Sequence, residues 1–191
     1  MALVKSAMLV DGENLVFRYQ AMVSEGKVPK KSVIHQKDVL VWDRQIQNLW
    51  NTDFYRVSYY TSCVGDTDAL ETLRKKISDI NFNVGNGHRS YYGKIDLTPH
   101  VYKKAKASTK SRLVDINICI DAMRYACSTG TEVVTILSGD GDFGELVREL
   151  QRQGRKVCVG AFSSGLAQEL IYLPDSFVSL DELFFEDSPV A

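Results

Sequence analysis

The feature that most constrains the fold is an alternation of short apolar runs with helical patterns. Apolar runs of strand length occur near residues 6–10, 54–62, 133–138, 156–162 and 176–180. Helical patterns lie between them, near residues 14–24, 66–80, 113–128, 142–153 and 165–173. This alternation is typical of a parallel sheet covered on both faces by helices. We therefore predict an α/β fold with a central, mostly parallel sheet between two layers of helices.

Other segments are less regular. A second helix is predicted from about Lys37 to Trp50, after a break at Gly26 and Pro29. Over residues 81–104 we predict a further strand and an irregular or hairpin segment. With 191 residues the chain is long enough for one such domain and short for two. We expect a single domain over residues 1–183, followed by a tail over 184–191.

Composition excludes several classes of protein. The formal net charge of −1 gives no overall attraction to nucleic acids or membranes. The four cysteines include no C-x-x-C pair, so neither a zinc ribbon nor a disulfide framework is indicated. The three histidines show no ligand spacing and are expected at the surface. The first apolar run is too short for a signal peptide and no run reaches the length of a membrane span, so we expect a cytoplasmic location.

Aspartates follow the predicted strands at the points where the strands end. Asp11 ends the first apolar run, Asp140 and Asp142 follow the run at 133–138, and Asp115 opens the helix before that run. Each alone could cap a helix, hold a turn or complement a helix dipole. Together they would repel each other at one sheet edge, by about 4 kcal/mol for a pair roughly 4 Å apart. A divalent cation reverses that repulsion, and oxygen ligands suit Mg²⁺ or Mn²⁺.

Glycines 139, 141 and 144 have the G-x-G-x-x-G spacing of dinucleotide-binding loops. Two carboxylates between them would repel a pyrophosphate, and no clear ribose-binding acid follows about 20 residues later. We expect instead that these glycines let the chain turn sharply. Asp140 and Asp142 would then face the crevice at the strand ends, and Phe143 would enter the core.

Three motifs together resemble the NYN domain family, in particular its LabA-like bacterial branch within the PIN-like nuclease superfamily. They are VDGEN at 10–14, VDIN at 114–117 with a further acid at Asp121, and SGDGDF at 138–143. The match runs from about residue 6 to residue 180, in the family's order. The family pattern in the middle motif is closer to Lys-Gly-Val-Asp-Val, so Lys110 is displaced in this chain.

The resemblance implies a single-domain PIN-like, Rossmann-like three-layer fold and a ribonuclease that uses Mg²⁺ or Mn²⁺. The implied metal ligands and catalytic residues are Asp11, Asp115, Asp140 and Asp142. Asn14 would orient substrate phosphate or water, and Ser138 matches a small hydroxyl residue before the last acids. Asp121 lies about 120° around a helix from Asp115. It either faces a second metal or supports the helix from outside.

A basic segment leads into Asp115. Residues 89–112 hold seven basic residues and one acid, with three tyrosines between them. Lysines that neutralise phosphates and tyrosines that stack on bases would suit single-stranded RNA, whereas a solvated hairpin with buried tyrosines is the alternative. The candidate substrate contacts are Lys103, Lys104, Lys110 and Arg112. The sequence leaves open whether the chain forms a homodimer or binds a regulatory protein.

Two other functions remain open. One is a regulatory RNA-binding or protein-interaction module with little turnover. The other is a phosphatase of the haloacid dehalogenase type, which also has an aspartate after its first strand and a late Gly-Asp-Gly loop. Such a phosphatase needs a second aspartate two residues after the first, where this chain has Glu13. We expect Glu13 and Glu145 to be solvated or to serve helix starts.

Overall fold

Seven strands form the central sheet, in the order β5-β6-β4-β1-β7-β8-β9. The computed structural model describes residues 4–50, 53–84, 93–106, 111–128 and 130–186. The strands of the sheet are β1 (Lys5–Asp11), β4 (Asp53–Cys63), β5 (Asn81–Val84), β6 (Gly93–Lys103), β7 (Val133–Leu137), β8 (Lys156–Ala161) and β9 (Ser176–Ser179). Neighbours pair in parallel except β5, which runs antiparallel to β6. The predicted α/β fold with a mostly parallel sheet is confirmed.

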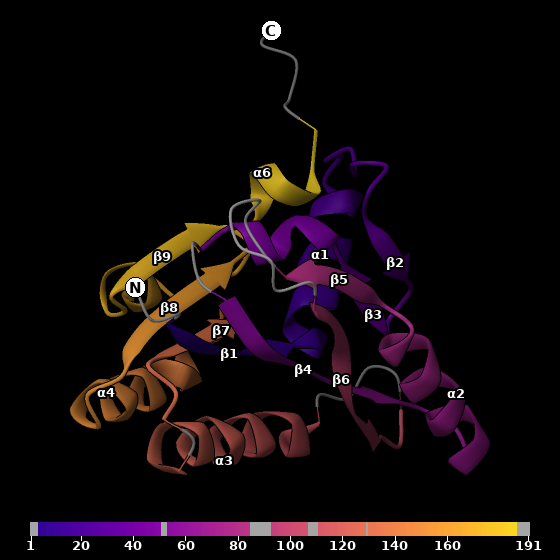
Figure 1. Cartoon of the computed structure of the whole chain (residues 1–191). Coiled ribbons are helices and arrows are strands. Elements are labelled where there is room, and N and C mark those ends of the chain that lie inside the picture. The colour runs from indigo at the N-terminus through magenta and orange to yellow at the C-terminus, as the bar shows by residue number, and fades with distance from the viewer. Residues whose placement is uncertain (1–3, 51–52, 85–92, 107–110, 129, 187–191) are drawn as a thin grey trace, which may run out of the picture.

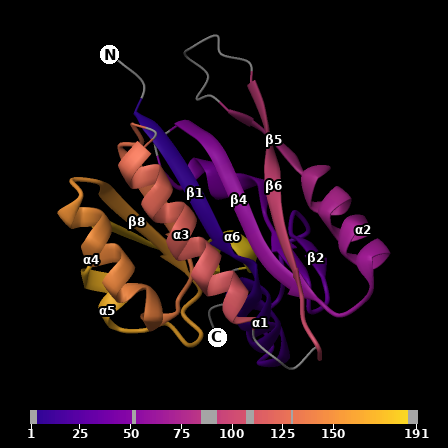
Figure 2. The same ribbon diagram turned by 90° about the horizontal axis from the view of Figure 1, so that it is seen from below.

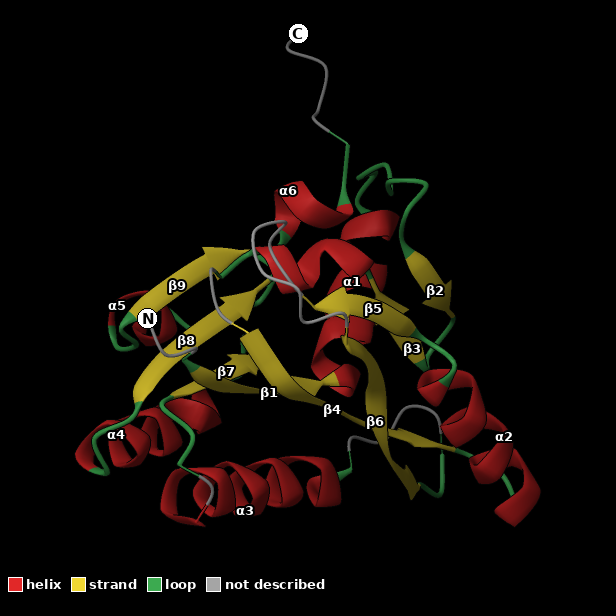
Figure 3. Cartoon of the chain, in the orientation of Figure 1, coloured by secondary structure: helices red, strands yellow, loops and turns green. Residues whose placement is uncertain are grey.

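Helices cover both faces of this sheet (Figures 1 and 3). The helices are α1 (Gly12–Ser24), α2 (Thr67–Ser78), α3 (Arg112–Ser128), α4 (Gly144–Arg152), α5 (Glu169–Tyr172) and α6 (Asp181–Phe184). Figure 2 shows α3 and α4 across one face, and α1 at the carboxyl ends of the central strands. In the described ranges, no helix is long and apolar enough to cross a membrane.

The core consists of two apolar clusters, one on each face of the sheet. On β1, Met8 and Val10 join the cluster under α1, whereas Leu9 joins the cluster under α3 and α4. This alternation follows from the two-residue period of a strand that is buried on both faces. Burial on both faces explains why the central strands read as continuous apolar runs in the sequence.

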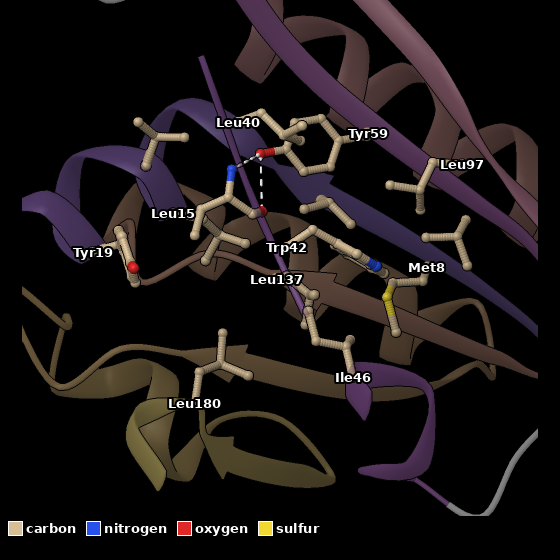
Figure 4. Close-up of a cluster of buried hydrophobic side chains, with 14 of the residues drawn as sticks. Met8, Leu15, Tyr19, Leu40, Trp42, Ile46, Tyr59, Leu97, Leu137 and Leu180 are labelled. Atoms are coloured by element: carbon tan, nitrogen blue, oxygen red, sulfur yellow. Dashed lines mark hydrogen bonds between the residues drawn. The ribbon is translucent and has the colours of Figure 1, made fainter. Parts of the chain in front are cut away.

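The predicted helix over residues 37–50 is wrong. The segment forms a hairpin of β2 (Ile34–Gln36) and β3 (Leu40–Trp42), followed by the short 3₁₀ helix η1 (Arg44–Asn48). Asp38 in the turn adopts a left-handed φ of 59°, which a helix interior does not allow. The hydroxyl of Tyr59 accepts a hydrogen bond from Val41 N and donates one to Val41 O, which ties β3 to the sheet (Figure 4). This tertiary contact overrides the local helical pattern.

The residues just after the predicted boundary at residue 183 pack against the core. Phe184 and Phe185 are 0% and 2% exposed and belong to the core cluster under α1. Phe185 also forms a β-bridge with Pro29, and Glu186 N donates to Val28 O. Phe184 and Phe185 therefore pack with the core of the domain, and the boundary between domain and tail stays a prediction.

Candidate metal and nucleic-acid site

Asp11 and Asp140 lie at the carboxyl ends of two neighbouring strands. Because β1 and β7 pair in parallel, Asp11 and the loop after β7 reach the same sheet edge. Ser138 Oγ donates a hydrogen bond to Asp11 Oδ2 at 2.9 Å and accepts one from Asp140 N at 3.2 Å. Asp11 and Ser138 are both 0% exposed, whereas Asp140 is half-buried. One buried hydroxyl therefore connects the two acidic segments.

Asn14 makes a second connection between the same segments. Asp11 caps α1, because its Oδ1 accepts a hydrogen bond from Asn14 N at 3.0 Å. The Asn14 side-chain oxygen accepts a hydrogen bond from Gly139 N at 3.2 Å. Asn14 thus connects the first turn of α1, directly after β1, to the loop after β7.

The loop after β7 turns into a short 3₁₀ helix, η2 (Gly141–Phe143). Asp140 caps this helix by accepting a hydrogen bond from Asp142 N at 3.1 Å, and Asp142 itself is exposed. Phe143 is 2% exposed, so its predicted entry into the core is confirmed.

The predicted reason for the glycines in this loop is wrong. Gly139, Gly141 and Gly144 are absent from the set of described glycines with positive φ, so no left-handed turn requires them. Gly141 instead allows the segment after β8 to approach closely, whereas that segment meets Gly144 only through the flexible end of Glu169. A Cβ on Gly141 would lie 3.1 Å from the Ala167 Cβ, and one on Gly144 would lie 2.8 Å from a Glu169 carboxylate oxygen.

Glu13 joins four elements at the same edge. Its Oε1 accepts hydrogen bonds from Ser62 Oγ and from Lys104 Nζ, the latter at 3.2 Å, and its Oε2 accepts one from Ser111 N at 2.9 Å. These contacts connect α1 to the ends of β4 and β6 and to the residue before α3. The side chains of Glu13 and Lys104 are only 9% and 10% exposed. Glu13 does lie at a helix start, as expected, but it is not solvated.

Asp115 lies in the first turn of α3, four residues after Ser111, and is half-buried. The contact of Ser111 with Glu13 therefore holds the beginning of α3 close to the first turn of α1. Nothing local in the sequence identifies Glu13 as this connection, because its partners are 49 to 98 residues away along the chain. Its position two residues after Asp11 placed Glu13 near the predicted site but did not indicate these partners.

The predicted basic contacts fall into three groups. Lys103 and Arg112 are exposed, at the end of β6 and the beginning of α3. Lys104 is paired with Glu13, which gives it a structural role. Lys110 and the segment 85–92, with Arg89, Tyr91 and Tyr92, lie outside the described residues.

Asp121 is held by partners beside the sheet. Tyr60 Oη donates a hydrogen bond to its Oδ2 at 2.8 Å, and Arg124 Nη1 donates one to its Oδ1 at 3.0 Å. Burial, together with the bond to Asp121, raises the pKa of Tyr60 far above its usual value, so its hydroxyl remains a donor. The half-buried His100 stacks on Tyr60 with ring centroids 4.3 Å apart, and is therefore not a surface residue as expected. Both oxygens of Asp121 serve this cluster, which favours the supporting role.

The acids at the sheet edge have the right chemistry for Mg²⁺ or Mn²⁺, since every donor is an oxygen. Within the described part of the chain, however, no three His, Cys, Asp or Glu side chains come together in an arrangement that could hold a metal ion. Mg²⁺ often binds through one or two carboxylates together with water and substrate phosphates. That smaller requirement asks for two carboxylates at most, and Ser138 joins such a pair, Asp11 and Asp140. The four-aspartate ligand set stays a prediction.

The fold, with acids at the carboxyl edge of β1 and β7, defines a PIN-like α/β domain. NYN domains belong to this class and are generally nucleases. The NYN domain profile matches residues 5–181, so the chain belongs to the NYN domain family. Among solved structures, the chain is similar to a protein of unknown function from Vibrio parahaemolyticus RIMD 2210633. The two share 22% identity with a TM-score of 0.60, over 96% of this chain and 97% of the other, which shows a common fold. The search of curated proteins found no match.

Proposed function

We propose that this chain is a metal-dependent ribonuclease that hydrolyses RNA phosphodiester bonds at the carboxyl edge of β1 and β7. The observation that carries the proposal is the Ser138 hydroxyl, which joins Asp11 to Asp140 in a domain of the NYN family. The motifs around these residues favour the LabA-like bacterial branch. The domain proper would extend through Phe185, with the remaining residues as a tail.

The protein's own contribution is to position the acids. Ser138 Oγ and Asn14 N orient the two oxygens of Asp11, and the η2 cap orients Asp140. These two aspartates would hold Mg²⁺ or Mn²⁺, with Asp115 and Asp142 as further ligands or acids beside the substrate. Such an ion would supply an activated water and neutralise charge on the phosphate.

Substrate contacts would come from the same edge. Asn14 lies in the first turn of α1, between Asp11 and the loop after β7, and would orient phosphate or water. Lys103 and Arg112 are exposed cations at the ends of elements that lead toward Asp115, and would neutralise phosphates of single-stranded RNA. Lys110 would join them.

One observation favours a second function, a regulatory RNA-binding module with little turnover. The described carboxylates do not converge in threes, and a module that only binds RNA would not need them to. The contacts of Glu13 count against the phosphatase alternative. Glu13, which would have to act as its second acid, is bound by Ser62, Lys104 and Ser111.

Cleavage of an end-labelled single-stranded RNA, with Mg²⁺ or Mn²⁺ and with EDTA, tests the proposal. We expect cleavage only with metal, and loss of cleavage in Asp11→Asn and Asp140→Asn with the circular dichroism spectrum unchanged. Asp68→Asn, an exposed acid in α2, is the matched control and should cleave like wild type. Equal degradation by wild type and the two site variants would identify a contaminant and refute the proposal. Turnover of a chromogenic phosphomonoester without RNA cleavage would instead favour the phosphatase.

A further inference from the structure

An exposed phenylalanine, Phe17, lies on α1 one turn after the site residues Glu13 and Asn14. Phe17 is 64% exposed, although it lies on a helix whose opposite side is buried through Leu15, Val16 and Tyr19. At about 100° per residue, Phe17 points roughly 40° away from Glu13 and roughly 60° away from Asn14, one turn farther along the helix. Glu13 reaches the ends of β4 and β6, and Asn14 reaches the loop after β7. Phe17 therefore points into the sector between these two contacts, on the helix that Figure 2 shows at the carboxyl ends of the strands.

The next residue, Arg18, is held beside that ring. Its guanidinium carbon lies 5.2 Å from the centroid of the Phe17 ring. The guanidinium also lies against the backbone of Gly165, in the loop between β8 and α5, because a Cβ on Gly165 would lie 2.0 Å from Arg18 Cζ. The cation is thus fixed between an aromatic ring and a loop rather than extended into solvent.

Arg18 is short of hydrogen-bond partners. Its Nε is buried and has no hydrogen-bond partner among the described residues. None of the salt bridges between described residues involves Arg18. A guanidinium that is fixed in place but not neutralised is suited to a phosphate, which it can bind with two parallel hydrogen bonds.

We propose that Phe17 and Arg18 form a nucleotide-binding subsite beside the acidic site, in which an unpaired base stacks on Phe17 and an adjacent phosphate binds Arg18. Aromatic stacking combined with a nearby cation is how proteins bind single-stranded nucleic acids without reading their sequence. The inference rests on the proposed function only in taking RNA as the polymer, and it needs neither metal nor cleavage.

The surroundings of Phe17 favour a base over an apolar protein surface. Its neighbours one turn away on α1 are Glu13, Asn14, Gln20 and Ala21, of which three are polar, and the carboxylate of Glu13 is turned toward Lys104 and Ser111. A protein-docking face needs contiguous apolar area, whereas a single aromatic ring among polar groups matches one base.

Fluorescence anisotropy in EDTA tests the stacking half of the subsite. The probes are a labelled single-stranded RNA 12-mer and an abasic 12-mer with the same backbone. Phe17→Ala should weaken binding of the RNA about ten-fold and leave binding of the abasic probe unchanged. Phe17→Trp should retain RNA binding. Tyr172→Ala is the control, because it removes another aromatic ring that is 77% exposed. Tyr172 lies on α5, which packs with the core cluster under α3 and α4. This variant should not change the affinity for either probe.

Three results would overturn the proposal. They are unchanged RNA affinity in Phe17→Ala, an equal loss on both probes, and a change in self-association on sedimentation without a change in RNA binding. The RNA-cleavage assay is read separately. If Phe17 contributes to RNA binding but wild type does not cleave RNA, the ribonuclease proposal is rejected and the subsite is kept. If wild type cleaves RNA and neither Phe17→Ala nor Arg18→Gln changes cleavage or binding, the subsite is rejected and the ribonuclease proposal is kept.

The Arg18 half has its own readout. Arg18→Gln should weaken binding of both probes and lower the salt dependence of binding by about one phosphate contact. Gly165→Ala should act similarly by displacing the guanidinium. Gly154→Ala is its matched control, because Gly154 has a similar φ of +73° against +61° but open space around its Cβ. Equal effects of the two glycine variants, or an unchanged salt dependence in Arg18→Gln, would contradict the role of Arg18.

Discussion

Ser138 Oγ donates a hydrogen bond to Asp11 Oδ2 over 2.9 Å, and both residues are completely buried. Removal of the hydroxyl leaves a buried carboxylate oxygen without this donor. We expect Ser138→Ala to lower the free energy of unfolding by about 1–3 kcal/mol, the usual cost of a buried polar group that loses its partner. Urea unfolding followed by circular dichroism measures the change.

Ser6→Ala is the matched control for this variant. Ser6 is also 0% exposed and also belongs to β1, but its Oγ has no hydrogen-bond partner among the described residues. Its replacement should leave stability unchanged or slightly increased. A loss in Ser6→Ala as large as that in Ser138→Ala would show that cavity formation, and not the bond to Asp11, dominates.

The ion pair between Glu13 and Lys104 should be strongly coupled. Both side chains are about nine-tenths buried and their charged atoms lie 3.2 Å apart, so either single change leaves a largely buried charge without its partner. We expect Glu13→Gln and Lys104→Met each to destabilise the protein by about 2–4 kcal/mol, and the double variant by clearly less than the sum. A double-mutant cycle of urea unfolding tests this, and additive losses would contradict it.

An exposed pair provides the comparison. Glu145 pairs with Arg148 one turn along α4, with side chains 78% and 36% exposed. Solvent screens such pairs, so Glu145→Gln should change stability by no more than about 0.5 kcal/mol. Both glutamates were predicted to be solvated or to serve helix starts; Glu145 is exposed, whereas Glu13 lies at a helix start with its side chain only 9% exposed.

The difference between Glu13 and Glu145 shows what local sequence could reveal. The sheet was predictable because buried parallel strands read as apolar runs, and parallel strands deliver Asp11 and Asp140 to one edge. The contact between Glu13 and Lys104 joins residues 91 positions apart, and no local pattern encodes it. The hairpin at 34–42 was missed for the same reason, since Tyr59 holds it from another strand.

Two glycines near the site should respond oppositely to alanine. A Cβ on Gly12 would lie 2.3 Å from the Tyr59 ring and 2.7 Å from the backbone oxygen of Tyr60, neither of which can readily move. A Cβ on Gly144 would meet only the flexible end of Glu169. We expect Gly12→Ala to cost roughly 1–3 kcal/mol and Gly144→Ala to be neutral or to gain up to about 1 kcal/mol from helix propensity. Thermal unfolding of both variants measures these changes in stability. If Gly144→Ala loses as much stability as Gly12→Ala, the beginning of α4 does need a glycine.

Substitution of Asp121 should affect stability, whereas substitution of Asp115 should affect RNA cleavage. Both oxygens of Asp121 accept hydrogen bonds, from Tyr60 and Arg124, so Asp121→Asn should reduce stability while RNA cleavage remains within a few-fold of wild type. Asp115→Asn should abolish cleavage and keep the fold. Tyr60→Phe should reproduce the stability loss of Asp121→Asn. Loss of cleavage in Asp121→Asn without loss of stability would instead support a second metal at Asp121.

Stability should fall on mild acidification because of His100. Burial lowers the pKa of His100 below its ordinary value of 6.5, and the smaller opposing effect of Asp121 does not cancel it. Between the folded-state pKa and about pH 6.5 the unfolded chain therefore binds a proton that the folded chain does not. The contribution of His100 to stability is complete above that pH and is lost as the pH falls toward the folded-state pKa, by at most about 1.4 kcal/mol per pH unit for one histidine.

The slope of stability against pH is therefore the readout, measured by urea unfolding between pH 7 and pH 5. His100→Gln also loses the stacking on Tyr60, so its absolute stability should fall at every pH. Its slope should nevertheless be shallower than that of wild type. His35 also has a pKa lowered by burial, and His35→Gln measured in parallel separates the two contributions. An unchanged slope in His100→Gln would show that His100 does not titrate differently in the folded and unfolded chains.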